Sequence, residues 1–321
     1  MGEPTEQASA VRPTTAAVAA LIDNVERALR GKRRAVELAV TTLVARGHLL
    51  IEDVPGTGKS TLARALARSI DADFRRIQFT NDLLPADVLG LSVWSQSEER
   101  FRFQPGPIFA DVVLADELNR ATPRTQSGLL ECMSTGEVSI DGRTHALPDP
   151  FFVVATQNPL EFEGTYPLPE SQLDRFLVRL KLGYPERGAE RELLADVEQP
   201  HAVDRLEPVL DGAGLRALQE QADRVRVQPD LIEYVLDLVE ATRSTSRLLL
   251  GASPRAAIGL VAAVRAAAVV DGRDHALPDD VKRLAPAVLG HRVVPSPDPG
   301  GASDGQIAIE DLLETVAAPP L

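Results

Sequence analysis

Residues 53–60 read DVPGTGKS and match the phosphate-binding pattern G-x-x-x-x-G-K-[ST] at every position but the first. In such a loop, glycines let backbone N–H groups turn inward around phosphate oxygens, and the following helix points its positive end at them. Lys59 is of the type that reaches a β- or γ-phosphate, and Ser60 of the type that ligates Mg²⁺. An apolar run before the loop and a helical pattern after it supply the expected context.

Asp53 stands where the pattern has glycine. The first glycine mainly relaxes the backbone as the strand ends, whereas the N–H groups nearest the β-phosphate come from later residues of the loop. We therefore expect Asp53 to be compatible with nucleotide binding if its carboxylate points away from the phosphates. The predicted nucleotide-binding residues are Asp53, Val54, Pro55, Gly56, Thr57, Gly58, Lys59, Ser60 and Thr61, together with Asp116.

The segment VVLADE, residues 112–117, is a buried-strand pattern that ends in two carboxylates. Asp116 is placed to hold the Mg²⁺ shell, often through water, and Glu117 to position and polarise an attacking water. Adjacent acids alone usually mark a solvated strand end, but their position after a phosphate-loop strand favours the catalytic interpretation. ATP and Mg²⁺ are the predicted cofactors, with Ser60 and Asp116 as the metal residues.

Three further polar residues are candidates for the same site. Asn158 ends the buried strand VVATQN, where a turn before Pro159 is its ordinary role, and the neighbouring strand ends favour a place near the γ-phosphate. Arg175 precedes a strand, and its ordinary role is a surface ion pair. Arg255 opens a helix, where a positive charge does not help the helix dipole. Such a charge suggests a function, for example reaching a phosphate across a cleft.

Composition narrows the class of protein. The 321 residues are 44% hydrophobic, and the net charge of −13 disfavours broad nucleic-acid binding. A single cysteine, Cys132, allows no intrachain disulfide or cysteine metal cluster and favours a reducing cytoplasm. The first residues lack an apolar signal core, and the longest late apolar run is too short to cross a bilayer. We expect a soluble cytoplasmic protein without a membrane span.

After a predicted disordered tail over 1–14, apolar runs alternate with helical stretches over 15–185. This alternation predicts an α/β domain, a parallel sheet flanked by helices. Two stretches with polar turns, 91–103 and 137–147, predict inserted β-hairpins. Trp94, the only tryptophan, lies in the first hairpin, and we expect it to pack against the domain.

After Pro185 the strand patterns stop, and residues 186–321 predict a separate all-helical domain with a loop at 295–305. Segments 141–149 and 271–279 match at eight of nine positions. Their flanks differ, strand-like around one and helical around the other, so we interpret the match as chance rather than duplication.

Together these segments resemble the AAA+ ATPases and, among them, the MoxR family, over roughly residues 20–318. The blocks that carry the resemblance are HLLIEDVPGTGKS, FRFQPGPIFADVVLADELNRATPRTQSGLLECM, ATQNPLEFEGTYPLPESQLDRFLVRL and GASPRA, in that order. An acidic residue before VPG is familiar in this family. The implied fold is a P-loop core with two hairpin insertions, followed by a helical lid.

The resemblance also implies roles. Asn158 corresponds to the sensor 1 residue, Arg255 to the sensor 2 arginine of the lid, and Arg175 to an arginine finger presented to the neighbouring subunit's nucleotide. An arginine supplied in this way accelerates phosphoryl transfer and makes catalysis depend on assembly. Residues around Gly31 would lie near the adenine, and the hairpins would line the top or pore of a ring.

The implied activity is ATP hydrolysis in a homo-oligomeric ring, expected to be hexameric, that remodels or matures partner proteins. The partners implied are von Willebrand factor A (VWA) domain proteins, and metal-cofactor insertion is one outcome. The alternative is the ATPase subunit of a magnesium or cobalt chelatase. A nucleic-acid motor is disfavoured by the acidic charge. A binding-only switch is disfavoured by the intact set of Lys59, Asp116, Glu117 and Asn158.

Overall fold

A five-stranded parallel sheet organises the first part of the chain. The computed structural model describes residues 7–160, 164–195, 202–297 and 304–320. The strand order is β2 (Phe74–Gln78), β5 (Val112–Asp116), β8 (Phe152–Gln157), β1 (Leu49–Glu52) and β9 (Val178–Leu180). Val154 of β8 pairs with Leu114 of β5 and with Leu49 of β1, and each pairing is parallel. The carboxyl ends of these three central strands therefore lie at one edge of the sheet.

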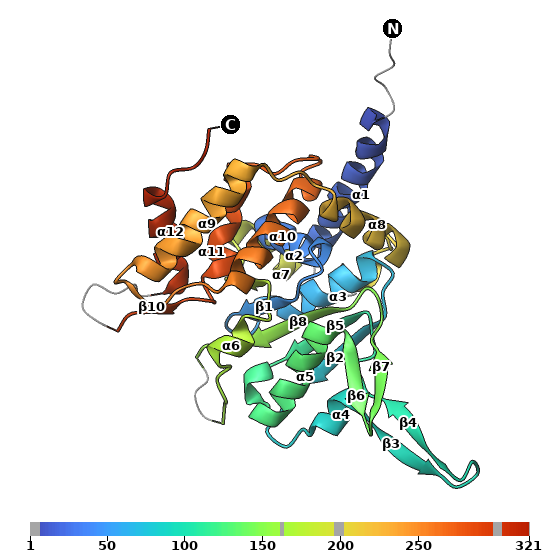
Figure 1. Cartoon of the computed structure of the whole chain (residues 1–321). Helices are drawn as coiled ribbons and strands as arrows, with labels where there is room; N and C mark the ends of the chain where they lie inside the picture. Colours follow the sequence, from blue (N-terminus) through green and yellow to red (C-terminus); the bar gives the residue numbers. More distant parts are fainter. Residues whose placement is uncertain (1–6, 161–163, 196–201, 298–303, 321) are drawn as a thin grey trace.

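Alternate residues of the strands face two hydrophobic clusters. In β1, Leu49 and Ile51 belong to one cluster and Leu50 to the other, as the period of two in a strand requires. Both faces are therefore buried, which explains the continuous apolar runs in the sequence. The first cluster includes residues of α1 (Gln7–Ala28), α2 (Arg33–Val44) and α3 (Lys59–Ser69), and the second includes residues of α4 (Pro85–Leu89) and α5 (Pro123–Thr135) (Figure 1).

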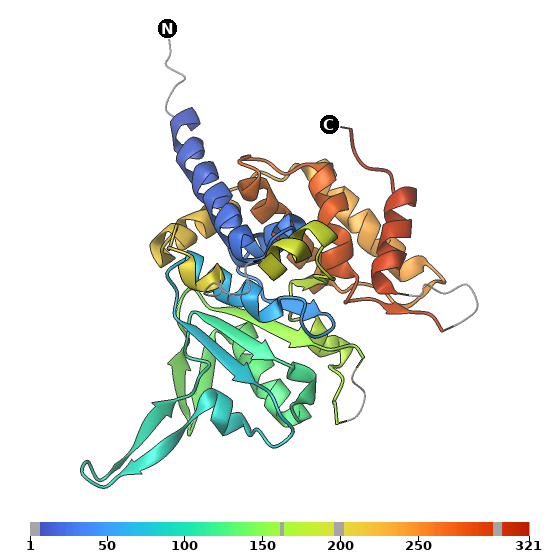
Figure 2. The same ribbon diagram turned by 180° about the vertical axis from the view of Figure 1, so that it is seen from behind.

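The rest of the chain is mostly helical and packs on the α1–α3 side of the sheet (Figure 2). Its helices are α7 (Arg187–Ala195), α8 (Gly212–Asp223), α9 (Pro229–Ser244), α10 (Pro254–Val270), α11 (Pro278–Leu289) and α12 (Gly305–Thr315), with a short helical turn at η2 (Ala202–Arg205). Two other short helical turns, η1 (Leu118–Arg120) and α6 (Glu170–Leu173), belong to the core. α10 contacts α2, α8 and α11, so the first hydrophobic cluster continues from the core into this part. Among the described residues no helix could span a membrane.

The two predicted hairpins are present. β3 (Gly90–Ser95) pairs with β4 (Arg100–Pro105), and β6 (Glu137–Ile140) pairs with β7 (Arg143–Ala146). The hairpins touch through Phe103 and His145, whose rings stack with centroids 4.0 Å apart. The prediction for Trp94 is wrong, because its side chain is 53% exposed and meets only Phe101 among the ring contacts of the described residues. A hairpin that projects from the sheet offers no core surface for this indole to cover. The predicted α/β core with two insertions is confirmed.

Two further features differ from the sequence-based expectation. Strands do not stop after Pro185, because β10 (Leu248–Leu250) pairs antiparallel with β11 (Val294–Pro295). The partners are more than 40 residues apart, so no local pattern could reveal the pairing. α1 begins at Gln7, inside the segment for which a disordered tail was predicted, where alanines favour helix. Residues 1–6 of that tail lie outside the described part of the chain.

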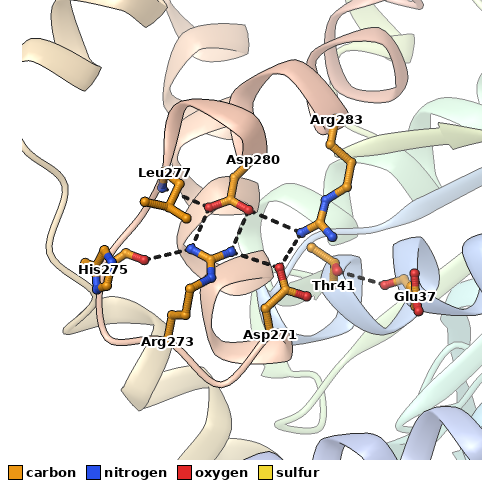
Figure 3. A network of polar contacts seen from close by, with 8 residues as sticks. All are labelled: Glu37, Thr41, Asp271, Arg273, His275, Leu277, Asp280 and Arg283. Atoms are coloured by element: carbon orange, nitrogen blue, oxygen red, sulfur yellow. Dashed lines mark hydrogen bonds and ion pairs between the residues drawn. The ribbon is translucent and has the colours of Figure 1, made fainter. Parts of the chain in front are cut away.

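The two similar nine-residue segments adopt different structures. Residues 141–149 begin with the turn of the second hairpin, whereas residues 271–279 lead from the end of α10 into the start of α11. Asp271 and Arg273 of this segment form a partly buried ion-pair network with Asp280 and Arg283 of α11 (Figure 3). There the Arg273 guanidinium donates to Asp280 at 2.7 and 2.9 Å and to Asp271 at 2.8 Å. Arg283 donates to the same Asp271 carboxylate at 2.8 Å. The different settings agree with a chance match.

His48 is a fully buried titratable group beside the sheet. Its Nδ1 accepts from the Val153 N–H at 3.0 Å, so its Nε2 carries the hydrogen donated to the Met133 carbonyl at 2.9 Å. Burial lowers the pKa of His48 to about 4, although the bond to Met133 opposes the shift. Protonation of Nδ1 would break the bond from Val153. The fold therefore requires the neutral imidazole.

We expect the free energy of unfolding to fall as the pH falls from 6.5, the ordinary pKa of His48, to about 4. The unfolded chain binds a proton in this range that the folded chain excludes, so stability rises with pH. His48 should account for about 3 kcal/mol of the loss. Urea denaturation at several pH values measures it: the difference between wild type and His48→Gln should depend on pH. A difference between wild type and His48→Gln that stays constant over this pH range would contradict the assignment.

Candidate functional site

The loop between β1 and α3 has the backbone geometry of an anion cradle. Gly56 and Gly58 have φ of 83° and 97°, in the left-handed region that favours glycine. A Cβ at Gly58 would also lie 2.7 Å from the Leu29 Cδ1 atom. α3 begins at Lys59 and has no acidic residue in its first turn, so the positive end of the helix is available to an anion.

The Asp53 carboxylate points away from the loop interior. Its Oδ2 accepts the N–H groups of Leu182 at 2.8 Å and Gly183 at 2.6 Å, and its Oδ1 accepts the Val54 N–H at 2.8 Å. The side chain is therefore committed to the segment that follows β9. Asp53 therefore does not direct its charge at the expected phosphate position. This is the condition under which we expected Asp53 to be compatible with nucleotide binding.

A cavity of about 400 Å³ lies where the loop meets the carboxyl ends of β5 and β8. Of the predicted site residues, those that line it are Pro55, Gly56, Gly58, Lys59, Ser60, Thr61, Asp116, Glu117 and Asn158. Those that do not are Asp53, Val54, Thr57, Arg175 and Arg255. Arg76, Thr156 and Gln157 also line the cavity and were missed by the sequence analysis. Two features of the sequence could have indicated such residues. Thr156 is a polar residue inside a buried strand, and Arg76 is a charged residue inside β2.

Asp116 is a buried carboxylate held by two partners. Its Oδ1 accepts the Thr156 hydroxyl at 2.6 Å, and its Oδ2 accepts the Arg76 guanidinium at 2.6 and 3.0 Å. The Asp116 side chain is only 10% exposed, whereas Arg76 is half-exposed. The guanidinium thus supplies positive charge to the Asp116 Oδ2. A divalent cation at this position would compete with Arg76 for Asp116.

Glu117 has a strained backbone and a tethered side chain. Its φ of 57° is unusual for a residue with a Cβ, and such residues cluster at functional sites. Its N–H donates to the Thr156 hydroxyl at 2.8 Å, so one threonine orients both acids. The Glu117 Oε2 accepts from Gln78 at 2.8 Å and pairs with Arg120 at 3.0 Å. These contacts define where the carboxylate lies at the rim of the cavity.

The position of Asn158 agrees with both interpretations of the sequence, a turn before Pro159 and a place near the γ-phosphate. Its Oδ1 accepts the Leu160 N–H at 3.1 Å, which closes the turn after β8. The residue is buried and lines the cavity beside the two acids. The turn therefore fixes the side chain at the end of the strand, next to the position expected for the terminal phosphate.

Arg175 lies outside this cavity, on the surface of α5. Its guanidinium donates to the Leu130 carbonyl at 2.8 Å and to the Ser134 hydroxyl at 2.5 Å. The flanking backbone is held by Arg292, which donates to the Asp174 carbonyl at 3.2 Å and the Phe176 carbonyl at 2.8 Å. Arg292 was not predicted from the sequence, because the Asp174 and Phe176 carbonyl groups lie more than 110 residues away from it.

Arg255 is exposed in the first turn of α10. Burial lowers the pKa of the neighbouring Arg292 to about 10, Asp174 opposes this shift, and Arg255 adds to it. Arg292 also donates to the carbonyl of Ala256, the residue after Arg255, at 3.5 Å, so the two cations are close neighbours. The structure brings Arg255 to the boundary between the helical part and the core, rather than into the phosphate cavity.

A second cavity of about 390 Å³ lies where the helical part meets the core. Gly31 and Lys32 before α2, Leu182 after β9, and Arg283 and Gln306 of the helical part are among its lining residues. Gly31, the residue expected near an adenine, thus lines a cavity of its own beside the segment that Asp53 holds.

The residues present suit Mg²⁺ bound together with phosphates. The Ser60 hydroxyl and the Asp116 carboxylate line the same cavity, and both are hard oxygen donors. Within the described part of the chain, no group of three or more His, Cys, Asp or Glu could hold a metal. Mg²⁺ usually takes one or two protein oxygens and completes its shell with water and phosphate, so this sparse set fits.

The dual role of Thr156 gives a prediction. Thr156→Val keeps the shape but leaves the buried Asp116 oxygen and the Glu117 N–H without this partner, which should lower the free energy of unfolding by about 1–3 kcal/mol. Thr42→Val is the control, because this equally buried hydroxyl bonds only to the Leu38 carbonyl of its own helix, and its loss should cost about 0.5 kcal/mol or less. Urea denaturation measures both. Equal losses would contradict the assigned role of Thr156.

The comparisons with known proteins agree with this geometry. The profile of the ATPase family associated with various cellular activities (AAA) matches residues 48–178, and that of the AAA lid domain matches residues 240–311. A crystal structure of a protein from Cytophaga hutchinsonii, provisionally assigned as an ATPase, superposes with a TM-score of 0.87 at 33% identity. The superposition covers 97% of each chain.

Curated relatives extend over most of the chain. The chain is 48% identical over 277 residues to the uncharacterized protein YeaC of Bacillus subtilis, covering 86% of this chain and 87% of that protein. It is 42% identical over 310 residues to Chaperone MoxR1 of Mycobacterium tuberculosis, covering 93% and 81%. Protein MoxR of Paracoccus denitrificans is 33% identical, covering 83% and 85%. With its loop, acids and helical lid, the chain belongs to the MoxR family of AAA+ ATPases.

Proposed function

We propose that this chain hydrolyses ATP to ADP and phosphate with Mg²⁺, as a ring-forming homo-oligomer, and uses the cycle to remodel or mature partner proteins. The observation that carries the proposal is the convergence of Lys59, Ser60, Asp116, Glu117 and Asn158 on one cavity of about 400 Å³. These residue types at these strand ends are the set that phosphoryl transfer needs. Its single cysteine suits a cytoplasmic setting.

The chemistry follows from the positions of the side chains. Lys59 and the N–H groups of the loop neutralise the β- and γ-phosphates. Ser60 and Asp116 would hold Mg²⁺, which would offset negative charge on the phosphate oxygens. Glu117 orients a water and accepts its proton as the water oxygen bonds to the γ-phosphorus. The bond from phosphorus to the bridging oxygen breaks, and its electrons leave with ADP. Asn158 helps to place the water.

Two arginines link ATP hydrolysis to the assembly of subunits in this proposal. Arg175 lies between α6 and β9, contacts α5 and does not line its own cavity, which supports a role toward the nucleotide of a neighbouring subunit, as in the family. Arg255 stands on the lid at its boundary with the core, where rotation of the lid would carry it toward the phosphates. Hydrolysis would then depend on ring formation, and we propose a hexamer.

The hairpins are the surface we assign to partner contact. Trp94 and Phe101 are 53% and 65% exposed, and with Phe103 and His145 they line an open cavity between the two hairpins. Exposed aromatic patches of this kind mark interaction sites. We propose a VWA-domain protein as the partner and insertion of a metal cofactor as one outcome, on the strength of the family membership.

The catalytic assignment predicts that Glu117→Gln binds ATP but hydrolyses it about 10²–10⁴-fold more slowly, because the water loses its proton acceptor. Lys59→Ala should lose ATP binding. Glu52→Gln is the matched control, since Glu52 ends β1 at the same edge of the sheet but pairs with Arg179 at 3.3 Å and does not line the cavity. Steady-state phosphate release and binding of a fluorescent ATP analogue measure these effects. A Glu117→Gln variant with near-normal turnover would contradict the assignment.

The partner assignment predicts that Glu117→Gln, used as bait with ATP, captures a VWA-domain protein that is absent with ADP. The variant prolongs the ATP state, in which the partner surface is expected to be engaged. Mass spectrometry of the captured proteins identifies the partner. Enrichment of chelatase subunits or of nucleic acid instead would overturn this assignment in favour of those functions.

A further inference from the structure

The residues that join the sheet to the lid are held by the phosphate loop. We define residues 182–184 as the hinge segment, because they leave β9 and lead into α7. The Leu182 and Gly183 N–H groups both donate to the Asp53 Oδ2, at 2.8 and 2.6 Å. Gly183 has a φ of 65°, so the chain turns sharply at the point where it is held.

A second contact holds the hinge segment from the other side. The Lys32 ammonium donates to the Tyr184 carbonyl at 2.6 Å. Lys32 and Leu182 both line the cavity of about 390 Å³ that also receives Arg283 and Gln306 of the lid. The position of the hinge segment therefore sets the shape of the cavity between core and lid.

Asp53 is equally tied to the loop. Its carboxylate accepts the Val54 N–H, and its own N–H donates to the Gln157 carbonyl at 3.2 Å. The Lys59 ammonium donates to the carbonyl oxygens of Asp53 and Val54, at 2.5 and 3.0 Å. One residue thus contacts the phosphate-binding lysine through its backbone and the hinge segment through its side chain.

These contacts form a continuous path. On the proposed path, the Lys59 ammonium exchanges these carbonyl partners for oxygens of the β- or γ-phosphate when a nucleotide binds. The Asp53 carbonyl loses its donor in that exchange, and the Asp53 carboxylate is the group that fixes the hinge segment. Differential contacts of this kind are what allow a ligand to shift a conformational equilibrium.

We propose that Asp53 is a positioning residue that couples occupation of the phosphate loop to the orientation of the lid. The proposal rests on the proposed function, because it assigns a regulatory contact to the same nucleotide site. It explains why a carboxylate replaces the glycine at the entrance of the loop: glycine offers no acceptor to the two N–H groups of the hinge segment.

Hydrogen–deuterium exchange of the peptides spanning the hinge segment and α10–α11 tests the proposal, with and without saturating ATP and Mg²⁺. In Asp53→Gly, which restores the glycine of the pattern, the Leu182 and Gly183 amides should exchange about tenfold faster or more without nucleotide, because they lose a charged acceptor. The change in lid exchange that ATP causes in the wild type should disappear. Asp53→Asn, which keeps the side-chain size but only one acceptor oxygen, should change both readouts in the same direction.

Asp111→Asn is the matched control. Its carboxylate also accepts a backbone N–H, that of Asp73 at 2.8 Å, but at the opposite end of β5, so it should leave the exchange of the hinge segment unchanged. Hinge exchange in Asp53→Gly and Asp53→Asn that equals wild type would overturn the proposal. So would an ATP-induced lid change that persists in both variants, because faster exchange alone would then be a structural effect. A wild-type chain that binds no ATP would instead refute the proposed function, which separates the two failures.

Discussion

The parallel pairing of β1, β5 and β8 is the constraint on which the rest of the site depends. Because these strands run in one direction and in register, the loop after β1, the acids after β5 and the amide after β8 reach the same edge of the sheet. Burial on both faces fixes the strands, so the side chains beyond their ends have little freedom. The Thr156 hydroxyl then orients Asp116 and Glu117 together.

The charges at this edge are balanced by neighbours rather than left exposed. Arg76 faces Asp116, and Gln78 and Arg120 hold Glu117. If Mg²⁺ bound to Asp116, it would compete with Arg76, so nucleotide binding would reorganise this edge of the sheet. The Asp53 carboxylate at the entrance of the loop is also held by neighbouring groups, because it accepts three backbone N–H groups from two segments.

The cradle could be predicted from the sequence because its signals are local. Gly56 to Ser60 lie within one loop, and the two acids and Asn158 each mark the end of an apolar run. The residues that were missed act across the sheet. Thr156 meets Asp116 from 40 residues away, and so does Arg76. A strand pattern does not say which strand will be its neighbour, so such pairs appear only in the fold.

The wrong predictions from the sequence have the same cause, because they too concern contacts between distant parts of the chain. The exposure of Trp94 depends on where the hairpin projects, and β10 needs a partner that follows α11. The direction of the Asp53 carboxylate was required by the loop but its partners were not foreseen, because Leu182 and Gly183 lie about 130 residues further along. No residue pattern near position 53 indicates these two partners.

A crystal structure with Mg²⁺ and a non-hydrolysable ATP analogue tests the central claim most directly. The account predicts the phosphates against the N–H groups of Gly56–Ser60, with the Lys59 ammonium moved from the Asp53 and Val54 carbonyls to phosphate oxygens. The metal should lie between Ser60 and Asp116, and the adenine beside Gly31. An analogue bound elsewhere, or phosphates that do not touch this loop, would contradict the account.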